Sequence, residues 1–360
     1  GDVIRIDSVN GSCLIGEVHY ITQENLPTYD EYLALHGDAP VIKENLLYSA
    51  RTMDLRSDPS IRLRTEQDPS ALYYETDYLR LNTVFGDSWR TGGQTISYNF
   101  SVETSGYYHI SLKYRQYIIR DLPVFRSIAI DGEVPFENLE NYAFPYTTSF
   151  LNRTLMDENG DPLKVFLTAG DHVISFKAVD FSYRQAVETI QYLMNKIQTL
   201  ALNVKRYTSG GTDQYRDWDI ETYFPNAASD IASWADILDA LYAKLKPMSK
   251  VNAPSEISNL KVAASRLRKI ADDVNKLPSL MVQFSDGDSS VNQMLGAMMQ
   301  NFLRPGLEFE RFIVHGDVKL ASPRANFFVK GYENVARLVL SFTDDDYAAS
   351  GRKEGELSVW

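Results

Sequence analysis

The spacing of apolar residues changes along this chain, and that change constrains the fold more than any other feature. From about residue 46 to 180, apolar and polar residues alternate in several short segments, the pattern of half-buried strands. From residue 187, apolar residues recur every three or four positions, as on one side of a helix. Because the short strands have no helices between them, the first region predicts an antiparallel β-sandwich, not a parallel sheet.

The clearest strand pattern is "RTGGQTISYNFSVETSGYYHISLKYR", residues 90–115. It predicts a hairpin of two half-buried strands joined by a tight turn, in which Gly106 is free to adopt a positive φ. Further strands are predicted in "NLLYSARTMDL", "RSIAIDGEVPF", "DHVISFKAV" and "LEFERFIVHG", and a short helix in "TYDEYLALHG", with Gly37 as its stop.

Four apolar stripes predict a helical bundle. Alternate spacings of three and four suit helices that pack nearly parallel. The stripes are Val187, Ile190, Met194, Ile197, Ala201 and Val204; Ile231, Trp234, Leu238, Leu241 and Leu245; Ile257, Leu260, Ala264, Leu267, Ala271 and Val274; and Val291, Leu295, Met298 and Phe302. A further amphipathic helix is predicted in "SPRANFFVKGYENVARLVLSF", followed by a polar linker and a strand start, "ELSVW". That ending indicates a piece of a longer protein.

Charge and composition exclude several classes of partner. The net charge of −12 and the lack of a basic stripe argue against nucleic acid and anionic membranes. No apolar run approaches the roughly 20 residues that span a bilayer. Cys13 is the only cysteine, so no internal disulfide is possible.

No motif points to catalysis, so we expect a non-enzyme. The five histidines show no metal-ligand spacing: His19, His36, His109, His172 and His315. No cofactor is expected, although "DENGDP" (157–162) and "SDGDSS" (285–290) leave structural calcium as an alternative to simple turns. A glycosidase pair of facing carboxylates also stays open among 48 acidic residues.

Aromatic residues in loops are the candidate ligand-binding residues. Trp89 in "GDSWRTGG", with Tyr142 and Tyr146 in "NYAFPYTTSF", would stack on the apolar face of a sugar ring. The alternative is that Trp89 plugs the open end of the sandwich. Trp218 is expected to pack its loop against the bundle.

Two groups of motifs resemble known families. "WRTGGQTISYNFSVETSGYYHISLKYR", "IAIDGEVPF" and "LTAGDHVISF" look like the galactose-binding-like jelly roll of carbohydrate-binding modules, with "LEFERFIVHG" as its closing strand. The helical region containing "YRDWDIETYFP", and the segments after it, are similar to the N-terminal region of large Gram-positive extracellular solute-binding proteins of carbohydrate ABC importers, usually lipoproteins.

These resemblances imply a multi-domain α+β chain with a helical bundle inserted into the sandwich. The implied division is an N-terminal segment with a short helix (1–45), the sandwich (46–180 plus 306–316), the bundle (181–305), and a helix and linker (317–360) leading to a solute-binding domain. The implied function is a non-catalytic, cell-surface module that binds carbohydrate or cell-wall glycan, in a protein whose further domain meets an ABC permease. A spacer or protein-docking module without a small ligand is the alternative, and a glycoside-active domain is a third.

Overall fold

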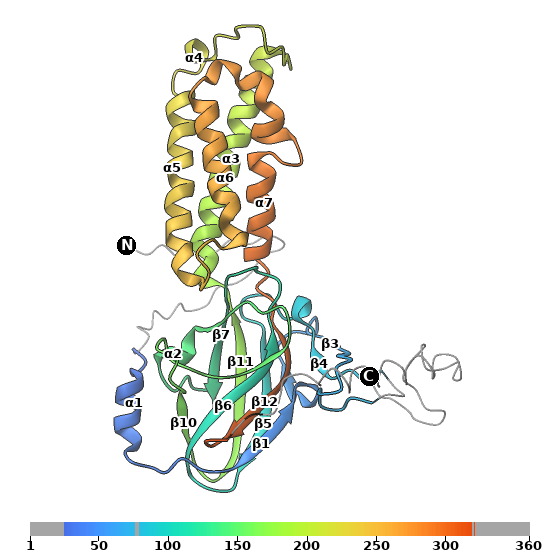
Figure 1. Cartoon of the computed structure of the whole chain (residues 1–360), viewed down its shortest axis with the longest axis vertical. Helices are drawn as coiled ribbons and strands as arrows, with labels where there is room; N and C mark the ends of the chain where they lie inside the picture. Colours follow the sequence, from blue (N-terminus) through green and yellow to red (C-terminus); the bar gives the residue numbers. More distant parts are fainter. Residues whose placement is uncertain (1–24, 76–78, 319, 321–360) are drawn as a thin grey trace, which may run out of the picture.

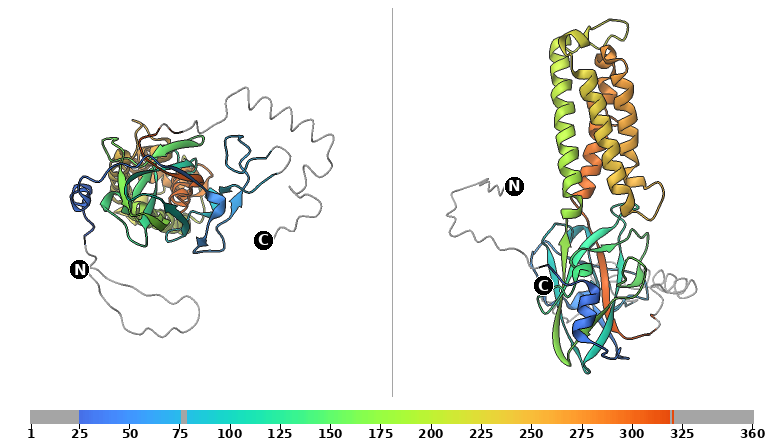
Figure 2. Two further views of the ribbon diagram at one scale, coloured as in Figure 1. Left: turned by 90° about the horizontal axis from the view of Figure 1, so that it is seen from below. Right: turned by 90° about the vertical axis from the view of Figure 1, so that its left-hand side faces the viewer.

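The computed structural model describes residues 25–75, 79–318 and 320. An antiparallel β-sandwich forms one end of the molecule, and an elongated helical bundle stands on it (Figures 1 and 2). This arrangement confirms the predicted α+β class. The predicted helix after residue 321, the linker, the "ELSVW" strand, Cys13 and His19 lie outside the described residues.

Among the described residues, two antiparallel sheets make up the sandwich. The larger sheet has the order β10 (Lys164–Leu167), β6 (Gly106–Arg115), β12 (Glu308–His315), β4 (Thr83–Val84) and β3 (Leu63–Arg64), with β1 (Asn45–Ser49) paired to β12 and β9 (Leu151–Thr154) paired to β6. The smaller has the order β2 (Leu55–Arg56), β5 (Thr95–Val102), β11 (Gly170–Val179), β7 (Val124–Ile130) and β8 (Tyr142–Phe144). The strand β12, which follows all the bundle helices in the sequence, lies between β6 and β1.

The two strands predicted around Gly106 exist, but they do not pair with each other. Strand β5 pairs with β11 in the smaller sheet, whereas β6 pairs with β12 in the larger one. The turn between them therefore crosses from one sheet to the other. The predicted positive φ at Gly106 is also wrong; a Cβ there would lie 2.6 Å from the Ile42 side chain and 2.7 Å from the Pro40 carbonyl oxygen, so close packing requires the glycine.

The prediction that β6 is half-buried is wrong, because both of its faces are covered. Its apolar side chains face the sandwich core. Lys113 on the other face is also fully buried, beneath the segment around Ser70: its Nζ donates to the Ser70 carbonyl oxygen at 3.2 Å and lies 3.3 Å from Glu310. The alternation of apolar and polar residues identified the strand, but it could not show that another segment covers its polar face.

The helical region forms the predicted bundle. Its long helices are α3 (Phe181–Thr208), α5 (Ala227–Leu245), α6 (Ser255–Ala271) and α7 (Val291–Phe302), with the short α4 (Ile220–Tyr223) at the far tip (Figure 1). Most of the stripe residues are buried; Val187, Met194 and Ala271 are partly exposed but still contact the core. The bundle core and the sandwich core form one continuous apolar cluster.

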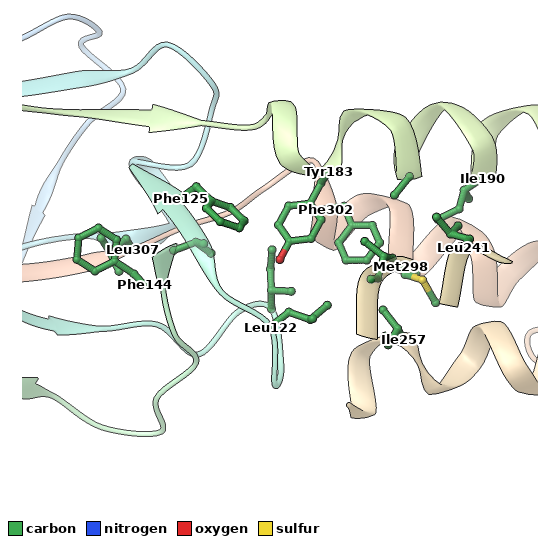
Figure 3. Close-up of a cluster of buried hydrophobic side chains, with 14 of the residues drawn as sticks. Leu122, Phe125, Phe144, Tyr183, Ile190, Leu241, Ile257, Met298, Phe302 and Leu307 are labelled. Atoms are coloured by element: carbon green, nitrogen blue, oxygen red, sulfur yellow. The ribbon is translucent and has the colours of Figure 1, made fainter. Parts of the chain in front are cut away.

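The contact between the two cores is centred on Tyr183, at the start of α3 (Figure 3). Its ring stacks on Phe302 with centroids 4.7 Å apart, and its hydroxyl donates to the Pro123 carbonyl oxygen at 2.6 Å. Burial raises the pKa of Tyr183 well above its ordinary value, so the hydroxyl stays protonated and remains a donor. The bundle is thus fixed to the sandwich by a packed, hydrogen-bonded joint.

The predicted helix near the N-terminus is confirmed as α1 (Tyr29–His36). Thr28 and Glu31 form a capping box at its start. Gly37 ends it with φ 61°, and its N–H donates to Leu33. Helix α1 packs against the β10 edge of the larger sheet, where the Tyr32 hydroxyl accepts from the Phe166 N–H.

Candidate functional site

A cavity of about 820 Å³ lies where the sandwich meets the base of the bundle. Its walls come from α2 (Glu137–Glu140), β8 and the loop after it, the β9–β10 connection, the β6–β7 connection, and the α5–α6 connection of the bundle. Such a volume lies within the range of small-ligand sites. The cavity is therefore the candidate binding site of the described part of the chain.

Two of the three predicted aromatic residues line this cavity. Tyr142 on β8 is almost fully buried, and its hydroxyl accepts from the Met156 N–H at 2.9 Å, which fixes its ring. Tyr146, four residues later, is half-buried and also lines the cavity. Tyr146 offers the more accessible surface for stacking.

Trp89 is not at this site, and its expected role as a stacking platform is contradicted by its burial. Its side chain is 0% exposed, and its indole N–H donates to the Gln94 carbonyl oxygen at 3.2 Å. The Arg126 guanidinium lies 4.2 Å from the ring centroid. Trp89 is a core residue at the end of the sandwich that faces the bundle, as in the alternative interpretation.

Arg126 itself is fully buried and is held by backbone carbonyl oxygens. It donates to Phe125 and Trp89 at 2.8 and 3.0 Å, and to Pro305 at 3.1 Å. Burial lowers the pKa of Arg126 to about 9, because the charged form loses its hydration. Since Pro305 joins the bundle to β12, Arg126 fixes the point where the chain returns to the sandwich.

Two asparagines in the cavity have unused hydrogen-bonding capacity. The side-chain oxygens of Asn138 and Asn141 are buried, and neither has a hydrogen-bond partner among the described residues. The Asn141 amide nitrogen already donates to Ser182 at 2.8 Å, which orients the group. Both oxygens are inaccessible to water, so they lie within the cavity wall and not on the surface that a ligand would contact.

The cavity wall has charged side chains of both signs. The cavity is lined by Glu137, Asp157 and Glu158, and by Arg153 and Lys250. Carboxylates accept hydrogen bonds, whereas Arg and Lys only donate them. A ligand with groups that both donate and accept matches such a wall, and sugar hydroxyls are of that kind.

The segment "DENGDP" forms a turn beside the cavity. Asp157 accepts from the Asp161 N–H at 2.8 Å, and Gly160 has φ 93°. The backbone N–H groups of Asp161 and Gly160 lower the pKa of Asp157, which keeps it anionic. In the described part of the chain, no cluster of three or more His, Cys, Asp or Glu side chains could hold a metal ion.

The histidines with described positions lie apart from the cavity, on strands of the sandwich and at the end of α1. His109 and His315 lie side by side on the larger sheet, with ring centroids 5.8 Å apart. The Nδ1 of His109 lies 2.8 Å from the Leu163 carbonyl oxygen, and the Nε2 of His315 lies 2.7 Å from the Ser111 hydroxyl. His36 stacks on Phe166 in the packing of α1.

Trp218 packs as expected at the other end of the bundle. It is 7% exposed, and its indole N–H donates to the Asp213 carbonyl oxygen at 3.0 Å. Asn138, Asn141, Arg153 and Lys250 were not predicted as site residues, since no motif surrounds them and only the folded chain brings them together.

Residues 185–302 match the family model of the bacterial solute-binding protein 4-helix bundle domain. This match confirms the resemblance to bacterial solute-binding proteins over the helical part of the chain. A comparison with curated proteins finds no match. No described helix is both long and apolar enough to cross a membrane.

Similar solved structures overlap the chain over less than half of its length. A family 35 carbohydrate-binding module from Clostridium thermocellum is 15% identical over 38% of this chain and 87% of that module, with a TM-score of 0.27. A Podospora anserina GH26-CBM35 β-(1,4)-mannanase is also 15% identical over 38% of this chain, but only 25% of that enzyme is covered, again with a TM-score of 0.27. The assignment of the sandwich rests on its own strand pairing.

Proposed function

We propose that this chain is a non-catalytic module of an extracellular solute-binding protein for carbohydrate import, and that the cavity binds a carbohydrate. The proposal includes the division into an N-terminal segment (1–45), a sandwich (46–180 plus 306–316), a bundle (181–305) and a following segment (317–360). It also includes a cell-surface location and a permease partner for the parent protein. The family match of the bundle supports the class of protein.

The observation that carries the carbohydrate assignment is the lining of the cavity, which combines Tyr146 with carboxylates and cationic side chains. An aromatic ring contacts the C–H face of a sugar, while fixed acceptors bind its hydroxyl groups. Carboxylates and cationic groups on the same walls provide acceptors and donors. This combination fits a polyhydroxylated ligand better than a purely apolar one.

The alternative, a spacer without a small ligand, is supported by the rigid joint around Tyr183. A bundle fixed at one angle to the sandwich would hold neighbouring domains at a set distance. The two roles are compatible in structure, but they predict different results in a binding experiment.

Affinity electrophoresis of the whole chain on a panel of plant, host and cell-wall polysaccharides tests the proposal. We expect retardation on at least one polymer and a roughly tenfold or greater loss of affinity in Tyr146→Ala, about 1.4 kcal/mol or more. Tyr192→Ala is the matched control, because Tyr192 is 50% exposed on α3 and does not line the cavity.

Unchanged melting temperatures for both variants would show that the loss is one of binding and not of folding. Retardation on no polymer would overturn the carbohydrate assignment and favour the spacer. Equal losses in Tyr146→Ala and Tyr192→Ala would place the ligand elsewhere on the protein.

A further inference from the structure

We infer that the inserted bundle is part of the binding site, and that its α5–α6 connection helps to select the carbohydrate. This inference rests on the proposed function, because it assigns a role to one wall of the same cavity. Met248, Lys250 and Val251 come from the bundle, whereas the tyrosines and asparagines come from the sandwich. A sandwich without the insertion would lack this wall.

A single residue of the sandwich anchors both ends of this connection. The Asp121 carbonyl oxygen accepts from the Ser249 hydroxyl at 2.6 Å. The Asp121 carboxylate accepts from the backbone N–H and the hydroxyl of Ser255, at 2.9 and 2.6 Å. Lys250 and Val251 lie between these anchors, so their backbone is held at the cavity edge in the absence of ligand.

Asp121 has an unusual backbone conformation, and its carboxylate lies at a helix start. Its φ is 64°, in the left-handed region that few residues other than glycine adopt. Its carboxylate lies at the N-terminus of α6, where negative charge is favourable. The Ser255 hydrogen bonds lower the pKa of Asp121, so it is anionic at neutral pH.

The side chains that the anchor positions add a cation and an apolar group to a cavity whose sandwich wall also has Arg153 and apolar residues. Lys250 brings an exposed cation to a cavity that also contains Glu137 and Glu158, and it provides donors for ligand oxygens. Val251 is 47% exposed and presents an apolar surface. The bundle thus supplies one polar and one apolar contact at a place where a change of size or charge would alter the accepted ligand.

The test compares Lys250→Ala and Val251→Trp with a control in the same connection, Lys246→Ala, whose exposed side chain does not line the cavity. Affinity electrophoresis measures the affinity of each variant for the polysaccharide that the parent chain binds most tightly, and the melting temperature of each variant is measured as well. We expect Lys250→Ala to weaken binding by about three- to tenfold, the effect of losing one ordinary hydrogen bond from a side chain that is exposed to water. Val251→Trp, which fills part of the cavity, should weaken it by more than about tenfold, and Lys246→Ala should match the parent chain.

A second readout is the order of affinities across the polymer panel. If the bundle helps to select the ligand, Lys250→Ala and Val251→Trp change that order, while Tyr146→Ala lowers all affinities. If Tyr146→Ala abolishes binding but both bundle variants bind like the parent, the ligand contacts the sandwich alone. That result overturns the inference and leaves the proposed function standing. If the parent chain binds no polymer, the proposed function falls and the inference falls with it.

Discussion

The sandwich and the bundle differ in where they keep their polar groups. Nearly all the buried polar and charged side chains of the described residues belong to the sandwich, among them Lys113, Arg126, Glu308, Glu310 and Arg311. In the bundle, only Thr208 at the end of α3 and Ser290, which caps α7, are buried polar residues. The bundle is a conventional amphipathic assembly, whereas the sandwich depends on internal polar contacts in addition to its apolar core.

The stability of the two parts should therefore respond differently when the same kind of charged residue is replaced. Bundle ion pairs, such as those of Asp239 with Lys261 and Arg268, lie at the surface, where water and salt screen them. Sandwich charges such as Glu310 are removed from water, so the loss of one partner leaves a buried charge without compensation.

The largest predicted effect is that of Glu310→Gln. The Glu310 carboxylate lies 3.3 Å from Lys113 Nζ and 2.9 Å from Arg311 Nε, and it accepts from the Leu72 N–H. Its neutralisation would leave two buried cations facing each other, so we expect the free energy of unfolding to fall by about 3–5 kcal/mol. Urea denaturation followed by circular dichroism measures this change.

The matched substitution in the bundle is Asp239→Asn, which also replaces a carboxylate with an amide beside two cations. Because its partners are partly exposed, we expect a cost below about 1 kcal/mol. Similar costs for the two variants would contradict the contrast between the sandwich and the bundle.

A smaller effect is predicted at the joint, for Tyr183→Leu. Leucine keeps an apolar contact but removes the stacking on Phe302 and the hydrogen bond to Pro123, together about 2 kcal/mol. Because the two cores are continuous, the parent chain should unfold in one calorimetric transition. We expect Tyr183→Leu to separate this into two transitions, and a single transition at a lower temperature would show that the joint does not depend on this residue.

The same contrast explains what the sequence could and could not predict. A helical stripe is local, since each apolar residue lies three or four positions from the next, and the four stripes were correctly predicted. Strand pairing is not local: β6 pairs with β12, about 200 residues later, with the whole bundle between them. Alternation therefore identified β5 and β6 as strands but assigned them to one hairpin, and it could not reveal that both faces of β6 are covered.

The candidate site was predictable only in part, for related reasons. Tyr142, Tyr146 and Trp89 were proposed because aromatic residues in predicted loops are typical of sugar-binding sites. Tyr142 and Tyr146 line the cavity, but Tyr142 lies on β8 and is almost fully buried, and Trp89 is a core residue. Whether a loop aromatic is exposed depends on what packs over it, here Arg126 and the end of the bundle. Lys250 reaches the cavity only because Asp121, more than 120 residues earlier, anchors its loop.

A pH-dependent effect, smaller than those at Glu310 and Tyr183, is predicted for His172, a buried polar residue of the sandwich. Its Nδ1 lies 2.7 Å from the Asp131 carboxylate and its Nε2 lies 2.7 Å from the Thr168 carbonyl oxygen. Both acceptors are satisfied together only when both ring nitrogens carry a proton. Burial tends to lower the pKa of His172, but these hydrogen bonds outweigh it, and the pKa is raised.

A raised pKa in the folded state stabilises the protein below the unfolded pKa of about 6.5, and this contribution is lost as the pH rises through the folded value. We therefore expect His172→Gln to cost about 1 kcal/mol at pH 5.5, a modest value because Asp131 is half-exposed, and less at pH 8.5. Urea denaturation of both proteins at the two pH values measures the difference. A cost that grows with pH would mean that His172 is neutral in the folded protein, and that burial, not the two acceptors, determines its charge.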